Sequence, residues 1–238
     1  APIPDAEIAI STAGALFETT TDANGRFSLA NVPAGRHTVV RCVTQPDRPQ
    51  GRGLLREPSP VKQAALRLGL PLEQPERPEA ARFEGLRPDI GVVVAYGQLI
   101  RRDLLALPPH GMLGVHPSLL PNYRGAAPVA WALLHGETAT GVTIFRLNER
   151  LDAGDLVLQR RVAIEPHEDA QALTGRLAQA GAQALVEALA AIAEGRVRFE
   201  PQDESQASLA PKLTKAQGRI DWGAPADAIE RLVRATVP

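Results

Sequence analysis

The amino-acid sequence predicts an α/β fold in which helices cover a mostly parallel sheet, with a small antiparallel β segment at the N-terminus. Three observations support this. After residue 37, short runs of β-forming residues alternate with helical patterns, which is typical of βα units. The run IGVVVAYG at 90–97 is apolar throughout, as in a strand buried on both faces. Residues 1–36 instead hold short β-forming runs between the turn signals AG and DANG.

The expected elements follow from these patterns in order. The N-terminal segment predicts three short antiparallel strands, AEIAIS, ALFETTT and RFSLANV. In the α/β part, strands are expected at 38–44, near 70–74, at 90–97, at 112–116 and as a pair within 140–164. Helices are expected at 60–69, near 78–86, at 101–107, 127–136, 170–195 and 225–236. The helix at 60 has the best-marked start, because Ser59 can cap its first turn and Pro60 suits its first position.

Composition excludes several classes of protein. The 238 residues are enough for one large domain with its own core. No apolar run reaches the roughly 18 residues that span a bilayer, and a single cysteine without a secretory leader favours the cytoplasm. The net charge of −1 gives no global basic field, so any RNA contact must be local. One basic cluster could supply it, although such clusters are more often solvated loops: Arg41, Arg48, Arg52, Arg56 and Lys62.

Two polar groups are candidates for chemistry. His116 ends the expected strand at 112–116, and in open α/β sheets ligands collect at the carboxyl ends of the strands. A histidine there can equally be satisfied by backbone groups. Asp152 and Asp155 flank Ala-Gly in the turn LDAGD, where acids more often form Asx-turns than act as catalysts. The five histidines have no metal-ligand spacing, so no metal site is expected, and the dinucleotide, P-loop and serine-hydrolase motifs are missing.

Several ordered motifs together resemble the methionyl-tRNA formyltransferases over about residues 37–238. They are TQPDRPQGRG, PSPVK, VVVAYGQLI, HPSLLPNYRGAAP, TGVTIFRLNERLDAGDLV and KLTKAQGRIDW. HPSLLP and LDAGD are shared with the wider folate-dependent formyltransferases, whereas TQPDRPQGRG and RIDW favour the tRNA enzymes. Residues 1–36 are similar to part of a carboxypeptidase regulatory-like β-sandwich module, with its Thr-Asp-x-x-Gly-x-Phe turn.

The resemblance implies a formyltransferase-type doubly wound sheet and the transfer of a formyl group from 10-formyltetrahydrofolate to the α-amine of methionine on initiator tRNA. His116 would be the catalytic donor to the developing oxyanion, and Asp152 would orient it and favour its charged form. Two short segments would contact the folate: Ser118, Leu119, Leu120 and Pro121, and Tyr96, Gly97, Gln98 and Leu99. Three arginines would contact the tRNA: Arg48, Arg52 and Arg124. We expect a cytoplasmic monomer with these two substrates as its partners.

Three departures from the family pattern predict an impaired enzyme. Gly114 stands two residues before His116, where the family has a catalytic asparagine. We expect the usual first strand to be missing, with residues 1–36 in its place, and the family's C-terminal β-barrel to be absent. We therefore expect a catalytic domain at 37–226 and the start of a linker at 227–238. The alternatives are a formyltransferase acting on an amino sugar or ribonucleotide, and a non-catalytic folate-binding pseudoenzyme.

Overall fold

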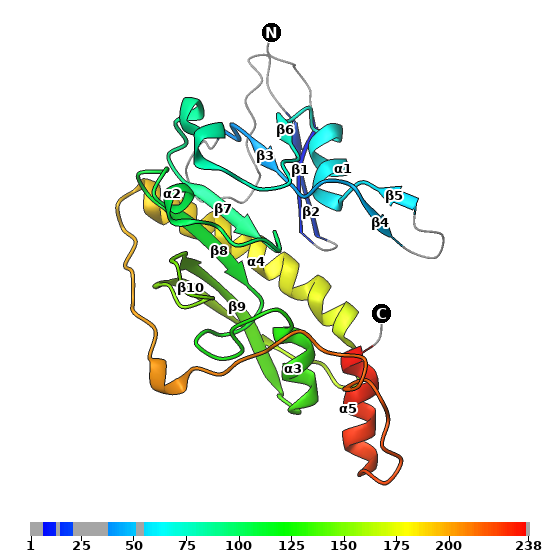
Figure 1. Ribbon diagram of the computed structural model, residues 1–238. Helices are drawn as coiled ribbons and strands as arrows, with labels where there is room; N and C mark the ends of the chain where they lie inside the picture. The colour runs from blue at the N-terminus through cyan, green and yellow to red at the C-terminus, as the bar shows by residue number, and fades with distance from the viewer. Residues whose placement is uncertain (1–6, 13–14, 21–37, 51–54, 237–238) are drawn as a thin grey trace. The chain divides into compact units, whose positions relative to one another are not determined.

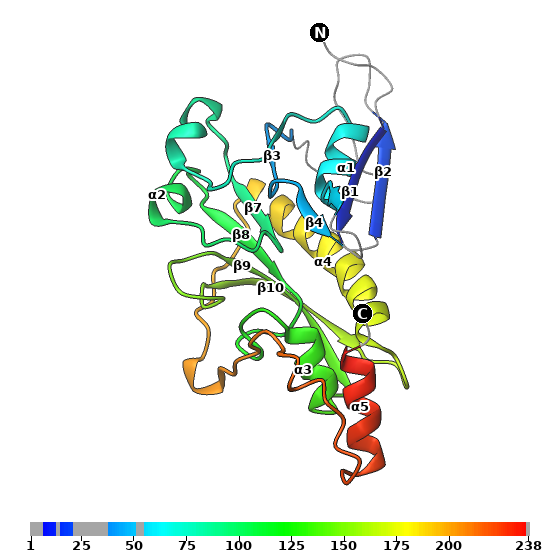
Figure 2. The same cartoon turned by 45° about the vertical axis from the view of Figure 1, so that its right-hand side comes forward.

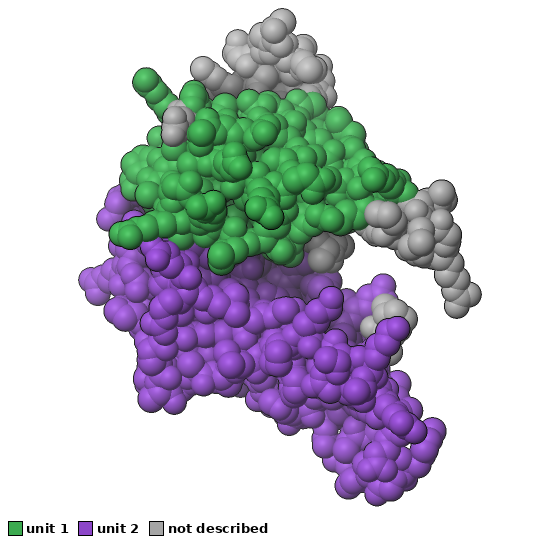
Figure 3. Space-filling view, in the orientation of Figure 1, with its two compact units in different colours: residues 1–112 green, residues 113–238 purple. Residues whose placement is uncertain are grey.

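A computed structural model describes residues 7–12, 15–20, 38–50 and 55–236. The chain divides into two compact units, residues 1–112 and 113–238, which Figure 3 colours green and purple. The third strand expected in the N-terminal segment, RFSLANV, lies outside the described residues.

Among its described residues, the first unit holds three pairs of short strands, one further strand and two short α-helices (Figure 1). Two of the strand pairs are antiparallel, and one is parallel. The antiparallel pairs are β1 (Glu7–Thr12) with β2 (Ala15–Thr20) and β4 (Arg48–Gln50) with β5 (Leu55–Glu57). The parallel pair is β3 (Cys42–Val43) with β6 (Leu72–Glu73). The remaining elements are α1 (Pro60–Arg67), β7 (Gly91–Val94) and α2 (Arg102–Leu105).

Helix α1 begins where the sequence predicts. The Ser59 side chain accepts a hydrogen bond from the Lys62 backbone N–H at 3.1 Å, and Pro60 occupies the first turn. This satisfies one of the backbone donors that a helix start leaves unpaired. Ala64 and Ala65 form the buried side of the helix.

Two other expectations in this unit are wrong. The helix near 78–86 is instead two single 3₁₀ turns, Ala80–Arg82 and Glu84–Leu86. Prolines at 78 and 88 bound the segment and Gly85 lies within it, so too few residues remain for a stable α-helical nucleus. β7 is shorter than expected because Ala95 takes a positive φ of 46°, and Val92 is 43% exposed, not buried. An apolar run alone does not settle how many of its faces are covered.

The second unit is built on three adjacent antiparallel strands. β8 (Met112–His116) pairs with β9 (Ala139–Arg146), and β9 pairs with β10 (Leu156–Ala163). The predicted pair of strands within 140–164 is therefore confirmed as a hairpin. The helices are α3 (Pro128–Leu134), α4 (Ala170–Ala193) and α5 (Ala226–Thr236), with a 3₁₀ turn at Glu204–Gln206.

Helix α4 packs against β9 and β10, and α5 packs beside α3 (Figures 1 and 2). Gly181 lets α4 approach closely, because a Cβ there would lie 3.0 Å from Val115 of β8. The core between these elements is apolar: Val129, Leu133, Val142, Leu173, Leu177 and Ala235. This packing fixes the end of β8 and the loops that follow it.

The structure is thus α/β with mixed sheets, since β3 and β6 are parallel while the strands of the second unit are antiparallel. Within the described ranges, no helix is both long enough and apolar enough to cross a membrane.

Candidate active site

His116 lies at the end of β8 with only 6% of its surface exposed. Its Nε2 is 2.8 Å from the carbonyl oxygen of Tyr123. Because a carbonyl oxygen only accepts hydrogen bonds, Nε2 carries the proton of the neutral ring. The lone pair then lies on Nδ1, which is 3.7 Å from Oδ2 of Asp152. The neutral ring can therefore accept a proton on the side that faces the carboxylate.

Asp152 lies in the loop between β9 and β10. Its backbone is left-handed, with a φ of 48°, and its Oδ2 accepts a hydrogen bond from the Gly125 N–H at 2.8 Å. Gly154 makes this tight loop possible, because a Cβ there would lie 1.6 Å from the Arg146 carbonyl oxygen. The loop thus brings Asp152 to His116 across 36 residues of sequence, as the resemblance implies.

Burial lowers the pKa of His116 below its ordinary value, and this effect outweighs the opposing effects of the Asp152 charge and the Tyr123 carbonyl. The neighbouring carboxylate does favour the charged ring, as expected, but burial of the ring has the larger effect on the pKa. At neutral pH the ring is predominantly uncharged and can act as a base.

The turn Ser118 to Pro121 is held by a buried threonine of β9. Thr143 donates to the Ser118 carbonyl oxygen at 2.7 Å and accepts from the Leu120 N–H at 3.0 Å. The Ser118 hydroxyl donates to the Asn122 carbonyl oxygen at 2.6 Å, and Gln159 donates to the Leu120 carbonyl oxygen. The Leu120–Pro121 peptide bond is cis. Because the Ser118 hydroxyl and the Leu120 N–H already donate within the protein, the turn would offer a ligand the second lone pairs of its carbonyl oxygens and the half-buried Leu119.

The second expected folate segment, Tyr96 to Leu99, belongs to the first unit. Gly97 has a φ of 73°, and the Tyr96 carbonyl accepts a hydrogen bond from Gln45. Among the described residues, the Tyr96 hydroxyl is one of the buried polar atoms that lack a hydrogen-bond partner, and Leu99 is 78% exposed. A single pocket made from both segments stays a prediction.

The three expected tRNA-binding arginines differ in their surroundings. Arg48 is on β4, more than half exposed, and close to Gln45 and Glu76. Arg52 lies outside the described residues, in the connection between β4 and β5. Arg124, by contrast, is 5% exposed, and its guanidinium donates to Gln202 and Glu204. Its guanidinium is thus engaged within the protein, and the phosphate contact expected of Arg124 stays a prediction.

Gly114 pairs directly with Phe145 across β8 and β9. A Cβ at 114 would lie 2.5 Å from Cε1 and 2.7 Å from Cζ of the Phe145 ring. The ring therefore occupies the space that an asparagine side chain would need.

The segment 200–211, which we call the C-terminal strap, also belongs to the site and was not predicted from the sequence. It bonds to the loop after β8 through its backbone, with Arg124 N–H to the Ser208 carbonyl at 2.8 Å and Ala210 N–H to the Arg124 carbonyl at 2.7 Å. The Ser208 hydroxyl also accepts from the Tyr123 N–H at 2.9 Å. The segment has no helical or strand period, so its sequence carries no signal of this role.

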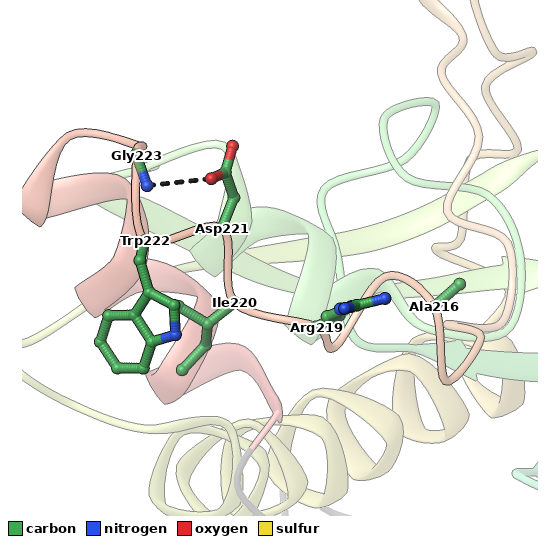
Figure 4. A pocket seen from close by; sticks show the side chains of 6 residues that line it. All are labelled: Ala216, Arg219, Ile220, Asp221, Trp222 and Gly223. Carbon is green, nitrogen blue, oxygen red and sulfur yellow. Dashed lines mark hydrogen bonds between the residues drawn. The ribbon is translucent and has the colours of Figure 1, made fainter.

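A shallow surface pocket lies farther along the chain and includes neither His116 nor Asp152. Figure 4 shows its lining, in which the Trp222 ring is 82% exposed and the Gly223 N–H donates to Asp221. Its residues are Ala216, Arg219, Ile220, Asp221, Trp222 and Gly223. Within the described ranges, no group of three or more metal-ligating side chains could hold a metal ion.

Comparison with known proteins shows the family of the chain. The sequence model of the formyl transferase family matches residues 10–189. A methionyl-tRNA formyltransferase of Thermus thermophilus is 52% identical over 207 residues, covering 85% of this chain and 67% of that protein. Those of Chloroflexus aggregans and a Roseiflexus species are 50% and 49% identical, covering 88% and 87% of this chain and 69% and 65% of those proteins. The chain thus spans about two thirds of the length of these relatives.

Solved structures show the same fold at lower identity. A sugar N-formyltransferase from Shewanella has a TM-score of 0.61 at 20% identity, covering 71% of this chain and 69% of that one. HypX from Aquifex aeolicus, in complex with tetrahydrofolic acid, has a TM-score of 0.59 at 23% identity, covering 66% of this chain and 27% of that one. About half of the residues are identical to those of these relatives over most of the chain. The chain therefore belongs to the methionyl-tRNA formyltransferases of the formyl transferase family.

Proposed function

We propose that this chain transfers the formyl group of 10-formyltetrahydrofolate to the α-amine of methionine on initiator tRNA. The observation on which this rests is the pair of the buried His116 and the partly buried Asp152, with Nδ1 and Oδ2 at 3.7 Å, at the carboxyl end of β8. Family membership supplies the reaction, and the pair supplies groups that the reaction needs.

The chemistry of the two side chains follows from their geometry. The folate supplies the formyl group, and the attacking amine must lose a proton. Nδ1 of the uncharged His116 ring accepts that proton, and the resulting cation faces Asp152. The Tyr123 carbonyl keeps the ring oriented through Nε2. The charged ring can then donate a hydrogen bond from Nδ1 to negative charge on the formyl oxygen. As the bond between the formyl carbon and N10 of the folate breaks, the ring returns the proton to N10, and tetrahydrofolate leaves.

We propose two contact regions for the folate. The backbone of Ser118 to Pro121 is held rigid by Thr143, and the buried Tyr96 hydroxyl has a free hydrogen-bonding capacity. Both features suit a flat polar ligand such as a pterin ring. Residues Gly97 to Leu99 complete the second region.

For the tRNA we propose the hairpin of β4 and β5, with Arg48 and Arg52, as the contact to phosphates. A small basic hairpin fits a chain with a net charge of −1, because the contact must be local. We further propose a cytoplasmic monomer, a doubly wound sheet without the usual first strand, and domain limits near residues 36 and 226. The family match begins at residue 10, inside the segment likened to a β-sandwich.

We also propose that transfer is slow. Gly114 brings no amide to the site, and the loss of one oxyanion donor lowers the rate by about 100- to 1000-fold.

The test is a transfer assay with labelled 10-formyltetrahydrofolate and methionyl initiator tRNA. His116→Gln and Asp152→Asn should each abolish the transfer that the unaltered chain shows. His135→Gln and Asp155→Asn are matched controls, since His135 is exposed and Asp155 lies in the same turn as Asp152. Both controls should keep full activity.

Other outcomes would decide against the proposal. Transfer to a nucleotide-linked amino sugar but not to methionyl-tRNA would establish the sugar enzyme instead. Binding of a folate analogue, seen as a raised melting temperature, without transfer to any acceptor would indicate a pseudoenzyme.

A further inference from the structure

We propose that Gln202, locked in place by Arg124, is a positioning residue that holds the Asp152 carboxylate against His116. The inference rests on the proposed function, because it assigns Gln202 to the same site. Its structural part can be measured without any transfer activity.

Gln202 clamps the turn that carries Asp152. Its side chain is 9% exposed, and its amide nitrogen donates to the carbonyl oxygens of Asp152 at 2.9 Å and Gly154 at 2.7 Å. Both amide hydrogens are used, one on each side of Ala153. Asp152 has a left-handed φ of 48°, which is unfavourable for a residue with a Cβ and needs support from its surroundings.

Arg124 fixes the orientation of the Gln202 amide. Its Nε and Nη2 both donate to Oε1 of Gln202, at 3.1 and 2.7 Å. The amide oxygen therefore faces the guanidinium, and the nitrogen faces the two carbonyls. If the amide were rotated by half a turn, its NH₂ group would face the donors of Arg124, and its oxygen would face the carbonyl oxygens of Asp152 and Gly154.

The charge of Arg124 is balanced locally. Nη1 and Nη2 donate to the two carboxylate oxygens of Glu204, both at 3.1 Å, and Arg150 also contacts Glu204. These two arginines hold the pKa of Glu204 below its usual range. The Arg124–Glu204 pair therefore adds little net charge near His116, which favours a mechanical role over an electrostatic one.

The loop after β8, which carries Arg124, also binds the side chain of Asp152. The Gly125 N–H, directly after Arg124, donates to Oδ2 of Asp152, the atom that faces His116. Arg124 thus fixes the backbone of Asp152 through Gln202, and the Gly125 N–H fixes the Asp152 carboxylate directly. Loss of Gln202 frees the turn while leaving every charged group of the site present.

The experiment compares Gln202→Leu with the matched control Gln206→Leu. Gln206 is on the same C-terminal strap, is exposed, and bonds only to Asp203 among the described contacts. For each variant, three quantities are measured: kcat and KM for formyl transfer, the hydrogen-exchange rate of the Gly125 amide, and the titration of the His116 ring by NMR.

We expect Gln202→Leu to lower kcat on the order of 100-fold with little change in KM, since small displacements of reacting groups have effects of this size. The Gly125 amide should exchange about tenfold faster as its bond to Asp152 opens. The pKa of His116 should fall further, because the nearby carboxylate that raises it has moved away. Gln206→Leu should change none of these quantities.

A double variant separates positioning from general destabilisation. In an Asp152→Asn background, Gln202→Leu should have no further effect on the His116 titration, because the group through which it acts is gone. If Gln202→Leu folds poorly, Gln202→Glu replaces it. Glutamate keeps the acceptor for Arg124 but loses both donors to the loop, so the faster exchange at Gly125 should remain.

The inference is overturned if Gln202→Leu leaves kcat at the level of the control, or if kcat falls while the exchange of Gly125 and the titration of His116 stay unchanged. An inactive parent chain would contradict the proposed function alone, because exchange and titration would still show whether Gln202 positions Asp152.

Discussion

Gly114 and Phe145 face each other across β8 and β9, and this pair decides what an added side chain at 114 can do. We predict that Gly114→Asn alone fails to raise formyl transfer, whereas Gly114→Asn with Phe145→Leu raises it by up to about 100-fold. In the single variant the new side chain and the buried ring compete for one space. In the double variant the smaller leucine leaves room for the amide to reach the site.

The magnitude of the clash is best measured with alanine. A Cβ at 114 would lie 2.5 and 2.7 Å from two ring atoms of Phe145, against a normal carbon–carbon contact of about 3.5 to 4.0 Å. Overpacking of this kind destabilises by about 1 to 3 kcal/mol. Replacing a strand glycine returns about 0.5 to 1 kcal/mol, because glycine loses more entropy on folding. The net cost of Gly114→Ala should therefore be about 0 to 2.5 kcal/mol.

A double-mutant cycle of Gly114→Ala and Phe145→Leu, followed by urea unfolding, checks the reasoning. Phe145→Leu alone should destabilise by about 1 to 2 kcal/mol through the lost ring atoms. The double variant should be more stable than the sum of the single effects by about 1 kcal/mol or more, since each change removes the cause of the other's cost. Additivity within about 0.5 kcal/mol would show that the ring and position 114 do not compete.

Three further predictions concern the same unit. The pKa of His116 is lowered in the folded state, so the unfolded state binds more protons at pH values between that lowered pKa and the ordinary value near 6.5. The free energy of unfolding should therefore rise with pH across that window. Urea unfolding at several pH values should show this slope, and His116→Gln should remove it. Gly154→Ala should lower formyl transfer by about 100-fold or more, because its Cβ would lie 1.6 Å from the Arg146 carbonyl oxygen; wild-type kinetics would show that the loop adapts. Leu177→Ala, at a site 1% exposed, should lower the unfolding free energy by about 2 to 5 kcal/mol, whereas Leu209→Ala, at a site 71% exposed, should change it by less than about 0.5 kcal/mol; equal effects would refute the assigned core.

Local chemistry made parts of the fold predictable. The Ser59 cap and the proline after it mark the start of α1, and the apolar strand ending in His116 appears at the expected residues. The helix near 78–86 was not predictable by the same reasoning, because its apolar spacing said nothing of the prolines' effect on nucleation. The exposure of Val92 depends on tertiary neighbours and not on its own run of residues.

Some residues of the site could also be predicted from the sequence, and others could not. His116 and Asp152 could be paired because the resemblance named both, and the structure places them 3.7 Å apart. Gln202 could not be found, since its partners are 48 and 50 residues away in sequence and its segment has no period. The resemblance named Arg124 as a tRNA contact, and its own loop gave no sign that it is buried against the distant residues Gln202 and Glu204. The competition between Gly114 and Phe145 required the strand register, which a sequence pattern does not specify.

The C-terminal strap has a consequence for the order of events during synthesis. The loop after β8 obtains its bonds from Arg124 to Gln202, Ser208 and Ala210 only when residues 78 to 86 positions later have left the ribosome. Until then a nascent chain holds both acid–base side chains but lacks the clamp that sets their separation, and closing so long a loop is slow. Competence for chemistry should therefore arrive late in the synthesis of this unit.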